Sequence, residues 1–187
     1  MLPPFFLIKC LSKMLGLSCI YTKYSSCHLQ SYDGGFGLVP GSESHGGATY
    51  CAVAALRLMG FIKDDSLSKF ISSSVINVPA LLEWSLQRQT IDGGFQGRTN
   101  KPSDTCYAFW VGSVLKILGA HHFFDKDALR AFLLSCQTPY GGFSKFPKQL
   151  PDLYHPYYGF CAFSLLDEPG IKPLCVELGT TDFSSGM

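Results

Sequence analysis

Asp104, Cys106 and His155 supply a carboxylate, a thiol and an imidazole, which are the donor types that zinc binds in proteins. Structural zinc sites are usually closed by four Cys or His ligands, whereas three ligands that include a carboxylate leave a coordination position open for substrate. One carboxylate, one of eight cysteines and one of five histidines can also coincide by chance, and free cysteine is a common core residue. The case for a catalytic metal site therefore depends on the elements that position these side chains.

A Gly-Gly-Phe signature occurs three times in the chain, and a glutamine lies four residues before its first glycine each time. The first glycines, Gly34, Gly93 and Gly141, are separated by 59 and then 48 residues, which is the period of a repeated helical pair with a variable loop. Each signature leads into an apolar segment. We expect these segments to form helices at residues 48–59, 105–118 and 157–166.

The chain contains two kinds of predicted helix. The three segments above are apolar nearly all round and should be buried, whereas residues 79–89 and 125–137 have one apolar stripe and should lie outside. Gly60 and Gly119 each follow an inner segment, where a left-handed helix end favours glycine. Alternating outer and inner helices predict an all-α protein that forms a partial α/α barrel, or toroid.

Alignment of the repeats places His45, Asp104 and His155 at equivalent positions, so we expect them at one rim of the barrel. Residues two apart point in different directions on a regular helix. Asp104 and Cys106 can therefore share a metal only if they flank the start of a helix. Pro102 and Ser103 directly precede them and suit such a start.

The same rim carries groups that suit an anion. A free thiol, with a pKa of about 8.5, is mostly protonated at neutral pH, whereas a metal-bound thiol is a thiolate that can attack carbon. If a substrate cysteine takes the open position, its electrophile needs a good leaving group. A diphosphate fits the nearby donors, although each cation alone is more often a solvated surface residue. These donors are His45, Arg98, Lys101, Tyr107 and Lys145.

Aromatic side chains lie in the inner segments or just before them. We expect Tyr50, Trp110 and Tyr154 to line a hydrophobic cavity that holds a long apolar chain, and core packing is the competing explanation for them.

From Gln30 to about Pro173 the chain resembles the β subunits of the CaaX protein prenyltransferases, and most closely those of protein geranylgeranyltransferase type I. The motifs that carry the resemblance are Glu-Ser-His-Gly-Gly at 43–47, Gly-Arg-Thr-Asn-Lys-Pro-Ser-Asp-Thr-Cys-Tyr at 97–107, and Asp-Leu-Tyr-His at 152–155. The resemblance implies a zinc ion on Asp104, Cys106 and His155. It also implies an isoprenoid diphosphate site at His45, Arg98, Lys101 and Tyr107.

The resemblance further implies partners and substrates. The β subunit works with an α subunit as a heterodimer, and it transfers geranylgeranyl from its diphosphate to the cysteine of C-terminal CaaX boxes, typically with Leu at X. Small GTPases are substrates of this type. The reaction implies a cytoplasmic location.

Lys145 and Tyr154 bear on which CaaX enzyme the chain resembles. Lys145 lies ten residues before His155, where the farnesyl enzyme has an Asp that binds magnesium. A lysine there replaces the charge of the ion, which favours the geranylgeranyl enzyme and predicts catalysis without magnesium. Tyr154 argues the other way, because an aromatic residue before the histidine ligand is typical of the farnesyl enzyme. A farnesyltransferase-like β subunit therefore stays open as an alternative.

The resemblance divides the chain into three parts. Residues 30–173 form the expected repeat domain, which corresponds to the C-terminal half of the family's barrel, whereas residues 1–29 match nothing in the family and residues 174–187 form a tail. Two further alternatives follow. The chain is an inactive, truncated fragment that binds the α subunit or isoprenoid diphosphate, or it is another toroid such as a terpene cyclase, which needs no zinc triad.

Composition fits a single intracellular domain. The chain has 187 residues and a net charge of +1, which gives no long-range attraction to nucleic acid. Its eight cysteines include no CxxC pair and are expected to be reduced thiols. The apolar runs are shorter than the roughly 20 residues of a spanning helix, so we expect no membrane span.

Overall fold

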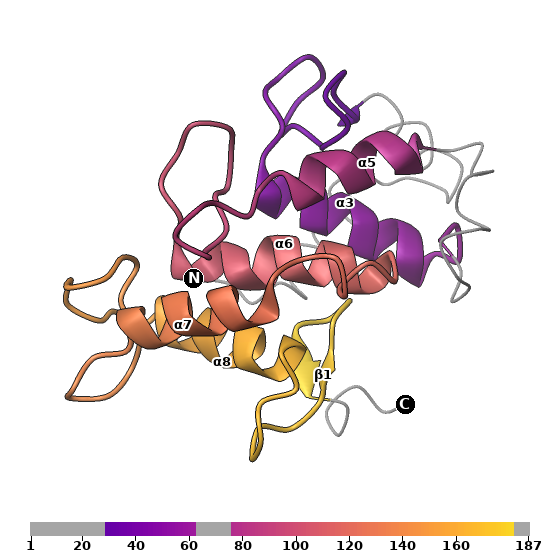
Figure 1. Ribbon diagram of the computed structural model, residues 1–187. Coiled ribbons are helices and arrows are strands. Elements are labelled where there is room, and N and C mark those ends of the chain that lie inside the picture. The colour runs from indigo at the N-terminus through magenta and orange to yellow at the C-terminus, as the bar shows by residue number, and fades with distance from the viewer. Residues whose placement is uncertain (1–28, 63–75, 182–187) are drawn as a thin grey trace.

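The computed structural model describes residues 29–62 and 76–181, and the account below is limited to these ranges. They contain five helices and one small hairpin (Figure 1). The helices are α3 (Gly46–Leu58), α5 (Val78–Leu86), α6 (Thr105–Ile117), α7 (Lys126–Cys136) and α8 (His155–Leu165). Strands β1 (Leu174–Cys175) and β2 (Thr180–Thr181) pair antiparallel, with Leu174 opposite Thr181.

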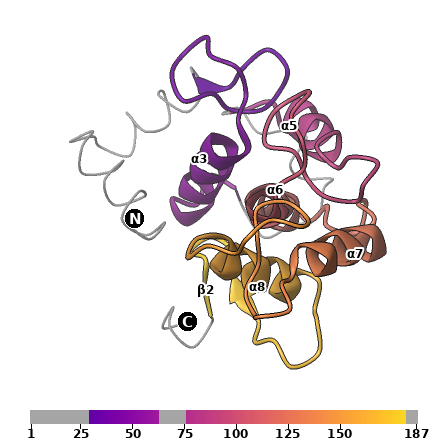
Figure 2. The same cartoon turned by 90° about the vertical axis from the view of Figure 1, so that its left-hand side faces the viewer.

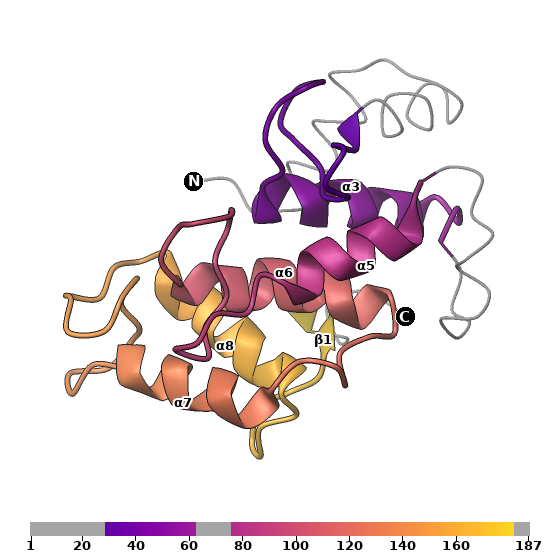
Figure 3. The ribbon, with the colours of Figure 1, turned by 45° about the horizontal axis from the view of Figure 1, so that its top comes forward.

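The helices form two layers. Helix α6 packs between α3 and α8 in an inner row, and α5 and α7 lie together on one side of that row (Figure 2). Figure 3 shows the same arrangement from above, with α5 on the α3 side of α6 and α7 on the α8 side. This is the predicted alternation of inner and outer helices.

The apolar pattern of each helix explains its layer. Helix α6 buries ten of its 13 residues, because apolar side chains surround it. Helix α7 instead buries a stripe of Leu129, Phe132, Leu133 and Cys136 and exposes its polar side. Leu129 and Leu133 of this stripe belong to the same buried hydrophobic cluster as the apolar residues of the inner row, so their burial helps to hold the two layers together.

The helix ends follow local rules. Gly60 and Gly119 have φ angles of +78° and +73° directly after the C-cap residues of α3 and α6, Met59 and Leu118, as predicted for left-handed helix ends. The outer helices begin with side-chain caps, because Asn77 and Asp125 accept hydrogen bonds from the amides of Ala80 and Ala128. Observed and predicted helix bounds differ by one to three residues at most ends.

The three Gly-Gly-Phe signatures form equivalent turns, each of which leads to an inner helix. In each turn the glutamine forms a β-bridge with the phenylalanine: Gln30 with Phe36, Gln89 with Phe95, and Gln137 with Phe143. The phenylalanines are buried under the inner row. The repeat seen in the sequence is therefore a structural repeat.

The segment after α8 packs on the inner row. The Tyr50 hydroxyl donates to the carbonyl of Val176 over 2.8 Å, and the Tyr157 hydroxyl donates to the carbonyl of Gly179. Arg57 and Glu177 form an ion pair of 3.2 Å. Residues 174–181 thus contact α3 and α8. Residues 1–28 of the predicted segment 1–29 and residues 182–187 of the predicted tail 174–187 lie outside the described residues, and the predicted domain boundaries stay a prediction.

Among the described residues, no helix is both long enough and apolar enough to cross a membrane. The cysteines of these ranges, which are Cys51, Cys106, Cys136, Cys161 and Cys175, are all free thiols.

Gln89 connects the second turn to the start of α7. Its side-chain amide donates to the Asp125 carbonyl over 2.8 Å and accepts from the Asp125 amide over 2.9 Å. We expect Gln89→Ala to lower the free energy of unfolding by about 3 kcal/mol, because three side-chain hydrogen bonds are lost at about 1 kcal/mol each, two with Asp125 and one to the Gly93 carbonyl. Urea denaturation measures this change. Gln149→Ala is the control, since Gln149 is exposed, and an equal loss in both variants would contradict the role of Gln89.

Candidate metal centre

The start of α6 positions the first two candidate ligands. Asp104 is the N-cap residue, with an extended backbone, and its carboxylate accepts a hydrogen bond of 3.0 Å from the amide of Cys106. Cys106 is the second residue of the helix. The two side chains therefore flank the helix start, as predicted, and the cap is Asp104 itself. Ser103 points elsewhere and donates to the Asp92 carboxylate.

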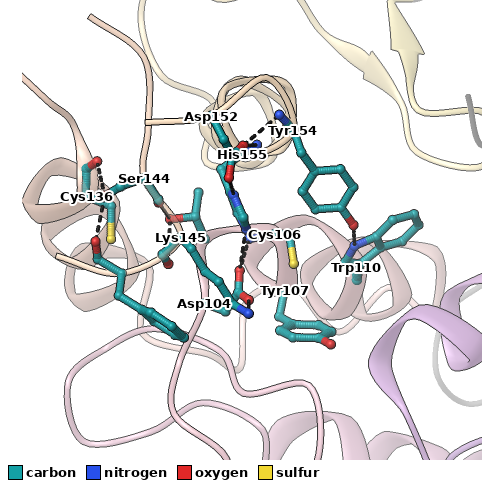
Figure 4. Close-up of polar contacts among 12 residues, drawn as sticks. Asp104, Cys106, Tyr107, Trp110, Cys136, Ser144, Lys145, Asp152, Tyr154 and His155 are labelled. Atoms are coloured by element: carbon teal, nitrogen blue, oxygen red, sulfur yellow. Dashed lines mark hydrogen bonds and ion pairs between the residues drawn. The ribbon is translucent and has the colours of Figure 1, made fainter. Parts of the chain in front are cut away.

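His155 completes the group from a different helix. It is the first residue of α8, and its Nε2 lies 3.2 Å from Oδ1 of Asp104. The ligand atoms of Asp104, Cys106 and His155 all lie within 4.8 Å of one another, and each residue is at most 6% exposed (Figure 4). The structure thus brings together the three residues that the sequence predicted, although 51 residues of chain separate Asp104 from His155.

Asp152 orients the histidine. Its carboxylate lies 2.6 Å from Nδ1 of His155 and also accepts from the backbone amides of Tyr154 and His155. With Nδ1 engaged by a carboxylate, Nε2 is left to face Asp104 and Cys106. A carboxylate behind a histidine is the usual outer partner of a metal ligand. This role of Asp152 was not predicted from the sequence, although a carboxylate three residues before a histidine at a helix start is a usable signal.

The protonation states of the three candidate ligands depend on whether a cation is bound. Burial, followed by the neighbouring Asp104, raises the pKa of the Cys106 thiol, so without a cation the thiol is protonated. Burial opposes ionisation of Asp104, but hydrogen bonds from His155 and Cys106 outweigh it and lower the pKa of Asp104. Burial likewise disfavours charge on His155, yet its two carboxylate partners raise its pKa. A bound metal ion would take the place of these protons.

The donor set fits a metal ion. Oxygen, sulfur and nitrogen ligands converge from three side chains, and the site is shielded from water. Three ligands leave a fourth tetrahedral position for a substrate atom.

Lys145 joins the site from the loop before α8. Its ammonium lies 3.6 Å from Oδ2 of Asp104, and its side chain is half-exposed. The loop is tied to α6, because the Thr105 amide and hydroxyl donate to the carbonyls of Lys145 and Ser144. The predicted position of Lys145 beside the metal ligands is therefore observed.

The neighbouring rim, at the starts of α3 and α6, holds the predicted anion-binding residues. His45 caps α3, and its Nε2 lies 3.0 Å from the Tyr107 hydroxyl. Gly97 makes room for Tyr107, since a Cβ on Gly97 would lie 2.0 Å from the tyrosine ring. Arg98 follows on the same loop and forms a 3.1 Å ion pair with Glu43, and Lys101 lies exposed beyond it. Binding of an anion by these four residues stays a prediction.

The predicted aromatic residues form one connected cluster. The Tyr50 and Trp110 rings are 5.0 Å apart, the Trp110 indole lies 3.4 Å from the Tyr154 hydroxyl, and both Trp110 and Tyr154 pack on Tyr158. Tyr50 is fully buried, so it contributes to the core. The role of the three residues as a cavity wall stays a prediction.

Comparison with known proteins agrees with the geometry. The family model of the prenyltransferase alpha-alpha toroid domain matches residues 7–180. The chain belongs to the prenyltransferase α/α toroid family. This assignment confirms the predicted fold class, and the matched range includes the metal cluster and the anion-binding rim.

Two relatives and one solved structure are closely similar. The chain is 72% identical over 150 residues to the geranylgeranyl transferase type-1 subunit beta of Arabidopsis thaliana. The aligned region covers 80% of this chain and 40% of that protein. It is 39% identical over 151 residues to the same subunit of Dictyostelium discoideum, covering 79% of this chain and 40% of that protein.

The solved structure is Candida albicans protein geranylgeranyltransferase-I complexed with GGPP. It aligns with a TM-score of 0.78 and 27% identity over 91% of this chain and 50% of that chain. This chain thus spans 40% of the length of the two relatives and 50% of the length of the solved chain.

The three ligands should hold a metal ion jointly. We expect Cys106→Ala and His155→Ala to lose bound metal, because two ligands rarely retain a divalent ion in competition with water and buffer. Elemental analysis of the purified chain gives the metal content. Cys136→Ala is the matched control, since Cys136 is a buried cysteine outside the cluster. Retention of stoichiometric metal in Cys106→Ala would remove this residue from the site.

Asp152 should act on metal affinity through His155. We expect Asp152→Asn to weaken metal binding about tenfold to a hundredfold, because the outer partner sets the tautomer and basicity of a histidine ligand. Competition with a chromophoric chelator measures the affinity. Asp167→Asn serves as the control, because Asp167 pairs with Lys126 on the surface and has a φ of 58° that asparagine tolerates. Equal affinities in all three proteins would exclude the orienting role.

Proposed function

We propose that this chain contributes to the β subunit of a zinc-dependent protein geranylgeranyltransferase type I. The observation that supports this proposal most is the buried Asp104–Cys106–His155 cluster with Lys145 against it. The similarity to two type-1 β subunits points to the same reaction. The reaction transfers geranylgeranyl from its diphosphate to the cysteine thiol of a C-terminal CaaX sequence.

Asp104, Cys106 and His155 would hold the zinc ion and leave one position for the substrate cysteine. When bound, zinc supplies a Lewis acid that keeps a coordinated thiol ionised at neutral pH. The substrate thiol gives up its proton to bulk water, its sulfur forms a bond to the first carbon of the isoprenoid, and the bond between that carbon and the diphosphate oxygen breaks. Diphosphate leaves with the electron pair of that bond.

The rim would hold the diphosphate. Arg98 and Lys101 supply positive charge for the phosphate oxygens, and His45 and Tyr107 supply hydrogen bonds from a pair that is already in contact. Burial and then the nearby Arg98 lower the pKa of His45, which keeps the imidazole neutral at physiological pH. Fixed donors of this kind stabilise the negative charge that develops on a leaving group.

Lys145 supplies a further positive charge next to the metal ligands. Its ammonium is 3.6 Å from Asp104, between the cluster and solvent. A fixed cation there would supply the positive charge that a magnesium ion would otherwise provide to the diphosphate. We infer that the enzyme does not require magnesium and that Tyr50, Trp110 and Tyr154 lie along the path of the isoprenoid chain.

The proposed partners are a prenyltransferase α subunit, as in a heterodimer, and CaaX proteins such as small GTPases. We infer a cytoplasmic location, because thiols stay reduced there and the cysteines of the described ranges are free.

Tyr154 supports a second candidate, a farnesyltransferase-like β subunit. A third candidate is a β-like protein that binds the α subunit or isoprenoid diphosphate without turnover.

The proposal is tested on the complex of this chain with a protein prenyltransferase α subunit, produced by coexpression. We expect one zinc per complex and transfer of labelled geranylgeranyl to a peptide that ends in a CaaX box with Leu at X. Cys106→Ala should lose both zinc and transfer, whereas Cys136→Ala should keep both. A complex that binds zinc and geranylgeranyl diphosphate but transfers nothing would favour the inactive fragment. Preference for farnesyl diphosphate would favour the second candidate.

Replacement of Lys145 tests the role of its charge. We expect Lys145→Asp to make turnover depend on magnesium, because a second carboxylate beside Asp104 removes the fixed cation and offers oxygen ligands to the ion. The transfer rate is measured against magnesium concentration. Lys148→Asp is the control, because Lys148 is exposed on the same loop and its substitution makes the same change in charge. A rate that stays indifferent to magnesium in Lys145→Asp would refute charge replacement.

A further inference from the structure

One charged side chain is buried against the loop that carries Arg98 and Lys101. Arg88 lies just after α5 and is 4% exposed. Within residues 29–62 and 76–181 it is the only lysine or arginine that is buried. Removal of a guanidinium from water is costly unless hydrogen bonds replace those to water. The partners of Arg88 therefore indicate what this residue contributes.

Two hydrogen bonds and one aromatic ring hold the guanidinium of Arg88. Its Nε donates to the Trp84 carbonyl over 3.2 Å, and its Cζ lies 5.0 Å from the centre of the Trp84 ring. Because Trp84 belongs to α5, these contacts fix the side chain on the outer helix. Its Nη1 donates to the Thr99 hydroxyl over 2.7 Å. Arg88 thus connects α5 to the loop at 97–102.

The other two repeats have no charge at this position. The carbonyl of Arg88 accepts from the amide of Gln96, which follows the phenylalanine of the second turn, over 2.9 Å. The carbonyls of Leu29 and Cys136 accept from the same place in the first and third turns, over 3.0 and 2.9 Å. The fold of such a turn therefore does not require a buried cation. The arginine occurs in the repeat whose loop carries two cations of the proposed diphosphate site.

The loop at 97–102 is closed at its base and turns at its tip. A β-bridge joins Gln96 to Ser103 at the base. At the tip, the Lys101 amide donates to the Arg98 carbonyl over 3.3 Å, which places Thr99 in the centre of a β-turn. Arg98 and Lys101 are therefore the two ends of one turn, and the residue that binds Arg88 lies between them.

Glu43 makes a second contact with this tip, through its 3.1 Å ion pair with Arg98. Both side chains of the pair are about half-exposed, so water and salt weaken it. The hydrogen bond from Arg88 to Thr99 has a charged donor that is buried, and hydrogen bonds of this kind are among the stronger ones. The bond to Thr99 is therefore the stronger of the two contacts that hold the tip.

Arg88 acts on the loop and not on a ligand. Its guanidinium has almost no exposed surface for a phosphate oxygen, whereas Arg98 is partly exposed and Lys101 is exposed. Long exposed cations lose conformational freedom when they bind an anion, and a loop that is held beforehand reduces this cost. A buried contact that fixes the turn between two cations therefore favours anion binding.

We propose that Arg88 is a positioning residue for the diphosphate site. Through the Thr99 hydroxyl it holds the turn that presents Arg98 and Lys101 to the phosphate oxygens. This inference rests on the proposed function, in which these two cations bind the isoprenoid diphosphate. The bond between Arg88 and Thr99 then raises the affinity for the charged end of the substrate without any contact to it.

Thr99 offers a direct test, because it is exposed and its substitution leaves Arg88 in place. Thr99→Val removes the hydroxyl at nearly constant shape, and Thr99→Ser keeps the hydroxyl as the matched control. Both are made in the complex of this chain with a prenyltransferase α subunit. Calorimetric titration measures the affinities for geranylgeranyl diphosphate, inorganic diphosphate and a CaaX peptide, and elemental analysis gives the zinc content.

We expect Thr99→Val to bind both diphosphates about tenfold more weakly, because the two cations must then be ordered during binding. Thr99→Ser should stay within about twofold of the unaltered complex. Zinc content and peptide affinity should not change, because the candidate metal cluster lies at the starts of α6 and α8. A general loss of structure would lower all of these quantities together and would contradict a positioning role.

Two further backgrounds show whether Thr99 acts between Arg88 and the cations. In Arg98→Ala/Lys101→Ala, addition of Thr99→Val should change the affinity for geranylgeranyl diphosphate by less than about twofold, since positions that act together are not additive. The same holds in Arg88→Met, which removes the same hydrogen bond. A loss of about tenfold that persists in either background would mean that Thr99 binds the ligand itself, and it would overturn the proposal.

Two other outcomes separate this inference from the proposed function. If Thr99→Val and Thr99→Ser bind geranylgeranyl diphosphate equally, the positioning role is wrong, while zinc binding and transfer by the unaltered complex still support the proposed function. If the unaltered complex binds zinc but neither diphosphate, the proposed diphosphate site is wrong and the inference fails with it.

Discussion

The Asp104 carboxylate connects the local structure of one helix to a histidine on another. As the N-cap of α6 it accepts the Cys106 amide, and this hydrogen bond places the thiol in the first turn of the helix. The same carboxylate lies 3.2 Å from Nε2 of His155 at the start of α8. If the helix began one residue earlier or later, the carboxylate and the thiol would point in different directions. The ligand group therefore depends on where this helix starts.

The repeated turns keep the helix starts at one end of the inner row. Each buried phenylalanine fixes a turn under the inner helices, and in two turns a glutamine holds the next outer helix by its backbone. Because the glutamines bond to backbone atoms of Asn77 and Asp125, they position the starts of α5 and α7 independently of the side chains that these helices expose. The candidate metal cluster, Lys145 and the His45–Tyr107 pair combine residues of all three repeats at the starts of α3, α6 and α8.

The family relationship and the site chemistry point in one direction. A compact Asp-Cys-His group with an open position suits thiol activation, and the adjacent cations and hydrogen-bond donors suit a diphosphate. The array also has an edge at the third turn and α8, where the contacts that complete the earlier repeats are missing among the described residues. The site and this edge are distinct features, since the ligands are at most 6% exposed while Phe160 is 54% exposed.

The sequence alone determined the helical repeat, the division into inner and outer helices and the three residues of the candidate metal cluster. Periodicity, glycine position and donor type are local properties, so they can be read along the chain. Only the tertiary structure decided that Asp152 orients His155, that Arg98 pairs with Glu43, and that residues 174–181 pack on α3 and α8. It also decided that the third repeat differs from the first two, although its signature is the same. These features depend on which surfaces meet in space, and a residue pattern within one repeat does not specify its neighbour.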